Sequence, residues 1–188
     1  MNQKCRSGIE VLVLSSIALF FVTLLFVPNT WALDLGRKQK SAERKLYITV
    51  TKKDRCPVCG MFVHPYQKWI TQIQFKDGSH HSFDGMKCMC RPYLDPGKYD
   101  ATKQRHDIEL VLVRDYYTLD FIRHDAAFYV VGSNVFGPMG HELIPFDSEN
   151  NADTFLFDHK GLKTLRFDEI NLELLDKLDK AKKTVTLE

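Results

Sequence analysis

Two short segments of the chain concentrate side chains that bind soft metal ions. The first is Cys56-Pro-Val-Cys59-Gly60-Met61, and the second, about eighty residues later, is Gly137-Pro138-Met139-Gly140-His141. Thiolate, thioether and imidazole donors together suit Cu(I) better than they suit zinc or the oxygen-preferring ions. The sequence therefore favours a Cu(I) site, and its candidate ligands are Cys56, Cys59, Met61, Met139 and His141.

The spacing in the first segment allows both thiols to face one ion. Two residues separate Cys56 from Cys59, and Gly60 lets the backbone bend closely around the metal. Met61 and Met139 add neutral, exchangeable thioethers, which suit a carrier that must later release copper. The sequence contains no paired carboxylates, phosphate-binding loop or nucleophile with a positioned base, so the pattern indicates a metal carrier and not an enzyme.

The cysteines also leave two other interpretations open. A structural zinc site would use Cys56, Cys59, Cys88 and Cys90, although a Cys-x-Cys half lacks the usual spacer of two to four residues. A thiol–disulfide oxidoreductase would use the Cys56–Cys59 pair. That chemistry needs the first cysteine at a helix N-terminus, and residues 60–65 are a poor helix start.

The remaining sulfur and imidazole side chains are weaker candidates. On a helix Cys88 and Cys90 would point about 200° apart, so they do not form an easy chelate. Met86 and Met89 share one helix face, and we expect them to pack in the core. Solvent exposure is expected for the other histidines, which are His64, His80, His81, His106, His124 and His159.

The elements that position the first segment follow from alternating apolar residues. Residues 69–75 and 79–83 predict a β-hairpin joined by the turn signal Asp77-Gly78. Asp84 then predicts the N-cap of a short helix over residues 85–91. Residues 108–114 are rich in β-branched and leucine side chains and predict the next strand.

The same order then recurs around the second segment. Strands are expected at 126–131 and 142–146, a helix at 152–159 after the cap Asp147-Ser148, and a closing strand at 162–167. The predicted fold class is α+β, with duplicated ββαβ units at about 55–115 and 126–168 packed as one compact domain. If the units pack about a pseudo-twofold axis, the two metal-binding segments could meet. From Asp168 onward an amphipathic helix is expected, with Ile170, Leu174, Leu175 and Leu178 on its apolar face.

The N-terminus has the pattern of an export signal. Lys4 and Arg6 precede the apolar run 11–27, and Thr30-Trp31-Ala32 offers a cleavage site. Residues 1–32 are therefore expected to be a signal peptide or an N-terminal membrane anchor, residues 33–45 a polar basic tether, and residues 46–188 the folded domain. The balance of 26 Lys and Arg against 24 Asp and Glu gives no field that would attract nucleic acid.

Several motifs together resemble the NosL family of nitrous oxide reductase accessory proteins. The similarity runs from Arg55 to Phe167 and rests on the co-occurrence of Cys-Gly-Met with Gly-Pro-Met-Gly. The residues that carry it are Cys56-x-x-Cys59-Gly60-Met61, Phe83-Asp84-Gly85, Asp115-Tyr116-Tyr117, residues 126–132, Gly137-Pro138-Met139-Gly140, Glu142 and Pro145-Phe146.

The resemblance implies a duplicated ββαβ fold and one Cu(I) held by sulfur with histidine participation. It also implies an extracytoplasmic role and a copper-accepting partner, namely nitrous oxide reductase or its assembly machinery. The N-terminal segment itself predicts export to the periplasm or, if it is not cleaved, association with the inner membrane. Many relatives are lipoproteins, whereas Cys5 precedes the apolar run instead of following it, so acylation is not expected here.

Overall fold

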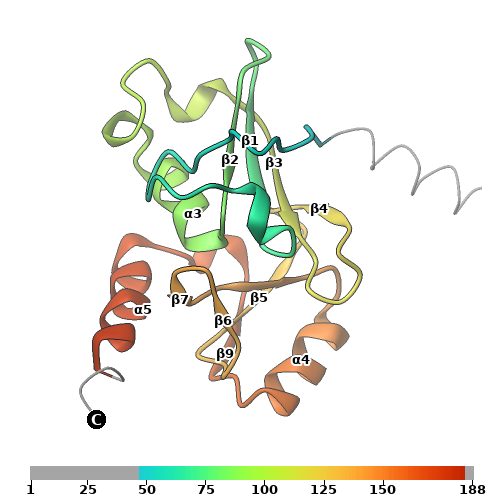
Figure 1. The fold of residues 1–188 in the computed structure, drawn as a ribbon. Coiled ribbons are helices and arrows are strands. Elements are labelled where there is room, and N and C mark those ends of the chain that lie inside the picture. Colours follow the sequence, from blue (N-terminus) through green and yellow to red (C-terminus); the bar gives the residue numbers. More distant parts are fainter. Residues whose placement is uncertain (1–46, 185–188) are drawn as a thin grey trace, which may run out of the picture. The chain divides into compact units, whose positions relative to one another are not determined.

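The computed structural model describes residues 47–184 (Figure 1). The signal or anchor expected at 1–32 and the tether expected at 33–45 lie outside the described residues. Within the described part of the chain, no helix is both long and apolar enough to cross a membrane.

The first sheet contains the predicted hairpin. Strands β1 (Thr71–Phe75) and β2 (His80–Phe83) pair antiparallel across the expected turn, where Gly78 has a positive φ of 82° and the Asp77 carboxylate accepts a hydrogen bond from the Ser79 N–H at 3.0 Å. Strands β3 (Ile108–Arg114) and β4 (Phe121–Arg123) extend the sheet in the order β2-β1-β3-β4. The three-residue β4 was not predicted, because so short a segment carries no periodicity.

A second sheet follows in the chain. Its strands are β5 (Phe128–Val131), β8 (Ile144–Phe146) and β9 (Lys163–Leu165), in the order β8-β5-β9 with antiparallel pairing. Between β5 and β8 the chain forms a small ribbon of β6 (Phe136–Gly137) and β7 (Gly140–His141). In both sheets, the first strand along the chain lies between its hairpin partner and the strand that follows the helix.

Three α-helices complete the described fold. They are α3 (Met86–Leu94), α4 (Glu149–Asp158) and the expected C-terminal helix α5 (Leu172–Thr184). Ser148 caps α4 by accepting a hydrogen bond from the Asn151 N–H at 3.4 Å. The predicted N-cap of α3 is wrong: Gly85 occupies that position without a side-chain cap. The short 3₁₀ turns are His64–Tyr66, Pro96–Lys98, Arg105–Asp107 and Phe167–Glu169.

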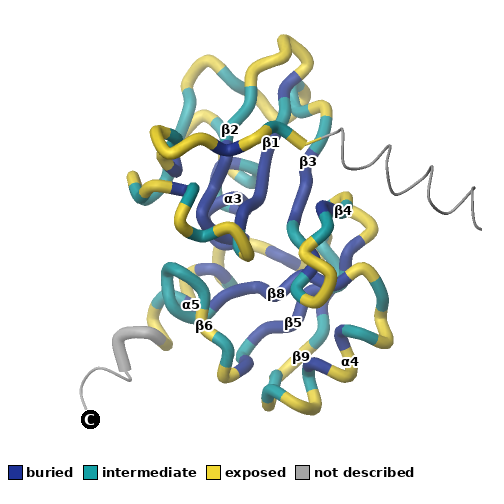
Figure 2. The backbone as a smooth tube through the Cα atoms, turned by 45° about the vertical axis from the view of Figure 1, so that its right-hand side comes forward, coloured by how far each residue is buried: buried dark blue, intermediate teal, exposed yellow. Residues whose placement is uncertain are grey.

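The buried residues form two clusters, and Figure 2 marks the buried stretches of the backbone in dark blue. The larger draws on both sheets and on the sulfur-rich first turns of α3, where Met86 and Met89 are buried as expected. The smaller cluster centres on Phe146 and Phe155 beneath α4. Asp115, buried at the end of β3, accepts a hydrogen bond from the Asp147 N–H at 2.8 Å, so it ties the first sheet to the end of β8.

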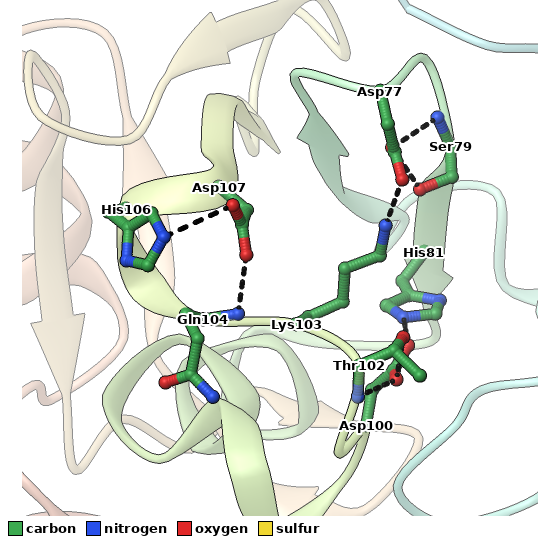
Figure 3. Close-up of polar contacts among 9 residues, drawn as sticks. All are labelled: Asp77, Ser79, His81, Asp100, Thr102, Lys103, Gln104, His106 and Asp107. Carbon is green, nitrogen blue, oxygen red and sulfur yellow. Dashed lines mark hydrogen bonds and ion pairs between the residues drawn. The ribbon is translucent and has the colours of Figure 1, made fainter.

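Two of the histidines pack against residues of the first sheet or next to it. His81 Nε2 lies 3.1 Å from the Asp100 carboxylate, and nearby Lys103 pairs with Asp77 at the hairpin turn (Figure 3). His124 packs edge-on against Tyr93, with ring centroids 5.3 Å apart. The expectation that His81, His124 and His159 are solvated is therefore wrong, because these rings are half-buried against aromatic neighbours, His159 on Phe155.

Candidate metal centre

A tight loop presents Cys56 and Cys59. The Cys56 N–H donates to the Met61 carbonyl at 2.8 Å, the Gly60 N–H donates to the Cys56 carbonyl at 2.9 Å, and Gly60 adopts a positive φ of 77°. This left-handed conformation favours glycine and reverses the chain within six residues. The bend that the sequence predicted at Gly60 is thus present, and it places both thiols on one side of the loop.

The N-terminal end of α3 supplies two further donors, Asp84 and Cys88. One donor atom from each of Cys56, Cys59, Asp84 and Cys88 lies within 4.8 Å of the others. The Cys59 thiol donates to both carboxylate oxygens of Asp84 at 3.4 Å. We call these four residues the thiol cluster.

The thiol cluster has the dimensions of a metal site. Two sulfurs on opposite sides of an ion bound at about 2.3 Å are about 4.6 Å apart. Small side-chain shifts would therefore bring all four donors onto one ion. Cys56 and Cys88 are only 1% and 5% exposed, whereas Cys59 is half-buried, so an ion would be enclosed on one side and reachable on the other.

The thiols differ in acidity. A hydrogen bond from the Cys88 thiol lowers the pKa of Cys56 to about 7, and the same bond raises the pKa of Cys88 well above its ordinary value. Burial raises the pKa of Cys59 to about 12. Around neutral pH Cys56 is therefore about half ionised while Cys59 and Cys88 keep their protons, and metal binding must release the remaining thiol protons.

The second predicted segment lies against the same end of α3. Lys87 of α3 donates its Nζ to the Met139 carbonyl at 3.0 Å, and its backbone N–H donates to Glu142 Oε1 at 2.7 Å. A Cβ added at Gly85 would lie 2.5 Å from Glu142 Oε2 and 4.0 Å from the Pro138 ring, so this close approach requires glycine. These contacts join the second segment to α3 and not to residues 56–61, so the expectation that the two segments form one site stays a prediction.

The five predicted ligands are distributed as follows. Cys56 and Cys59 belong to the thiol cluster. Met61 lines a surface pocket together with Cys59, and Met139 packs against the larger core cluster, which includes Cys56 and Cys88. The His141 ring stands edge-on to Phe136 with centroids 4.8 Å apart and does not belong to the thiol cluster.

Sequence reasoning missed Asp84 and set Cys88 aside. Asp84 has the residue type of a helix cap, but it precedes the N-cap Gly85 and its carboxylate faces Cys59. Cys88 was judged with Cys90 as a pair, and α3 indeed separates them, since only Cys88 joins the cluster while Cys90 is fully buried elsewhere. The signal that could have found both was the Asp-x-x-x-Cys spacing across a helix start, which brings the two side chains to one end of the helix.

The fold and the thiol cluster define a small α+β protein with a half-enclosed group of three cysteines and one aspartate that could hold a metal ion. The sequence profile of the NosL family matches residues 47–175, and the chain belongs to that family.

Two relatives carry informative names. The "Copper-binding lipoprotein NosL" of Stutzerimonas stutzeri is 29% identical in an alignment 162 positions long, which covers 81% of this chain and 81% of that protein. The crystal structure of the copper chaperone NosL from Shewanella denitrificans superposes with a TM-score of 0.58 at 25% identity, covering 69% of this chain and 98% of that one.

Proposed function

We propose that this protein is an exported Cu(I) carrier that supplies copper to nitrous oxide reductase or a related extracytoplasmic copper enzyme, and that it is not itself an enzyme. The observation that carries the proposal is the convergence of three thiols within 4.8 Å, in a chain of the NosL family. The names of the two relatives support copper as the cargo.

The proposed ligand shell has an inner and an exchangeable part. Cys56, Cys59 and Cys88 would hold the ion, because three soft thiolates suit Cu(I) and two of them are shielded from water. The loop side chains of Met61, Met139 and His141 remain proposed as the donors that assist capture and release. Met61 lines the pocket beside Cys59, and the carbonyl of Met139 accepts a hydrogen bond from Lys87 in the first turn of α3.

Two alternatives fit the site less well. The Cys₃Asp composition also matches a closed zinc site, with Asp84 in the place that sequence reasoning gave to Cys90. A thiol–disulfide oxidoreductase is disfavoured because Cys56 is followed by a turn and not by a helix, and because its sulfur is almost completely covered. Metal selectivity therefore separates the carrier from its nearest competitor.

The test is a Cu(I) competition titration of the reduced, metal-free chain under anaerobic conditions. One Cu(I) per chain is expected, and Cys59→Ser and Cys88→Ser should each weaken it by at least about tenfold. Met139→Leu should weaken it less. The matched controls are Cys90→Ala and Met89→Leu, since both residues are buried in the core outside the cluster.

The outcomes distinguish the alternatives. Stoichiometric zinc that resists Cu(I) and is insensitive to Met139→Leu would favour the structural zinc site. A Cys56–Cys59 disulfide that cycles readily with a dithiol, together with no bound metal, would favour the oxidoreductase.

The domain organisation and location form part of the proposal. Residues 1–32 would direct export or anchor the chain in the inner membrane, residues 33–45 would be a tether, and residues 46–188 the copper-binding domain. The lipoprotein name of the Stutzerimonas relative supports a membrane-attached, extracytoplasmic setting. Fractionation of cells that express the full chain would test it.

We also propose that the domain arose by duplication of a ββαβ unit. The support is the matching order of elements, β1-β2-α3-β3 and β5-β8-α4-β9, together with the matching strand orders β2-β1-β3 and β8-β5-β9. Superposition of residues 71–114 on 128–165 that failed to align equivalent strands and helices would contradict it.

A further inference from the structure

The thiol cluster opens to solvent through one face of the Cys56–Met61 loop. A surface pocket there is lined by Cys59 and Met61, and its rim includes Phe62, Pro65 and Tyr66. Phe62 is 44% exposed and adds apolar contact area to this rim. Any partner that exchanges metal with the cluster must reach it past this rim.

The loop around this pocket carries excess positive charge. Residues 51–68 include four basic side chains and one acidic side chain, a net charge of +3 in a chain whose overall net charge is +2. The four basic residues are Lys52, Lys53, Arg55 and Lys68, and all are exposed. The carboxylate of the acidic residue, Asp54, accepts hydrogen bonds from the Thr51 N–H and hydroxyl at 2.7 and 2.9 Å, so it pairs within its own turn.

These basic groups are available to a partner. Arg55 is held at the rim, because its guanidinium donates to the Gly60 carbonyl at 2.8 Å and lies 3.8 Å from the centre of the Phe62 ring. The side chains of Lys52, Lys53 and Lys68 form no hydrogen bond or ion pair with any residue in the part of the chain that the structure describes. Unpaired charges near a binding pocket steer oppositely charged partners toward it.

We infer that this rim is the docking surface for an acidic face of the copper-exchange partner, which presents a cysteine or methionine sulfur into the pocket beside Cys59. The inference rests on the proposed Cu(I) function and specifies the chemistry of the partner. It commits to a protein surface with Asp or Glu side chains around the sulfur, because the pocket combines apolar contact area with a fixed guanidinium, and the segment that forms it carries three exposed, unpaired lysine side chains.

The exchange step involves no change in oxidation state. The incoming sulfur forms a bond to Cu(I), and the bond between Cu(I) and the Cys59 sulfur then breaks. If the incoming group is a thiol, its proton passes to the released Cys59 sulfur, so charge and protons balance. Cys56 and Cys88 stay behind the ion, away from the opening.

The experiment measures Cu(I) transfer from the loaded full chain to two synthetic peptides. Both contain the same Cys-x-x-Cys core, with flanking glutamates in one and flanking lysines in the other, and their equal Cu(I) affinity is established first. Transfer to the acidic peptide should be at least about tenfold faster at low salt, and the difference should shrink as ionic strength rises. Lys52→Glu/Lys53→Glu should abolish the preference for the acidic peptide.

The control is Lys98→Glu/Lys160→Glu, which makes the same change in net charge at exposed positions outside residues 51–68. It should leave most of the preference intact. Equal rates to both peptides, or an equal loss of preference in the control, would overturn the docking surface. Cu(I) stoichiometry is measured on each variant beforehand, so failure of the copper site itself would be seen separately as the absence of bound copper.

Discussion

Replacing Glu142 by glutamine should change how the stability of this protein depends on pH. Glu142 joins the loop that carries Met139 to the first turn of α3, since its Oε1 accepts hydrogen bonds from the backbone N–H groups of Lys87 and Leu143 at 2.7 and 3.1 Å. Its Oε2 is buried and has no hydrogen-bond partner among the described residues. Burial raises the pKa of this carboxyl from 4.5 to about 7, although the Lys87 charge acts in the opposite direction.

The sign follows from proton binding. Between about pH 4.5 and 7 the folded protein keeps the Glu142 proton while the unfolded chain has released it, so the free energy of unfolding falls as the pH rises. A shift of about 2.5 pKa units corresponds to about 3 kcal/mol. Glu142→Gln keeps the acceptor oxygen and cannot ionise, so this pH-dependent loss should be absent from the variant.

The assay is urea unfolding of the reduced, metal-free chain, followed by circular dichroism at several pH values from 4.5 to 8. The difference in free energy of unfolding between variant and wild type should shift in favour of glutamine by about 3 kcal/mol over this range. Titration of other groups cancels in this difference. Glu109→Gln, at an exposed position on β3, is the control, and its difference in free energy of unfolding from wild type should not change with pH. If the difference in free energy of unfolding for Glu142→Gln also did not change with pH, the assignment of a buried, protonated carboxyl would be refuted.

Three further predictions concern stability. Phe155→Ala should lower the free energy of unfolding by about 3–5 kcal/mol, because it leaves a cavity in the smaller core cluster. Phe157→Ala on the same helix removes a side chain that is 85% exposed and should change the free energy of unfolding, measured in urea, by no more than about 0.5 kcal/mol. Ser148→Ala should cost about 1 kcal/mol by removing the cap of α4, and an unchanged midpoint would contradict that role. Asp179→Ala should cost on the order of 2 kcal/mol, because the partner ammonium on α3 is buried, whereas Asp176→Ala, which loses one exposed pair, should have little effect on the melting temperature.

Local patterns were sufficient for much of the fold. The hairpin turn at Asp77-Gly78, the Ser148 cap and the buried face of the C-terminal helix all depend on neighbouring residues, so their signals lie within a few positions. Element ends were less accurate. The helix predicted to stop at Arg91 continues to Leu94 through Pro92, which is buried and lies in the last turn of α3.

The sequence by itself determined the types of donor and the bend that presents two of them, because Cys-x-x-Cys-Gly-Met is a local arrangement whose geometry depends on six residues. Only the tertiary structure decided which other groups join them. Asp84 and Cys88 are 25 and 29 residues from Cys59 along the chain, and they reach it because α3 begins beside the loop. A ligand set is a property of points in space, and periodicity places a side chain on a face of its own element without stating what that face meets.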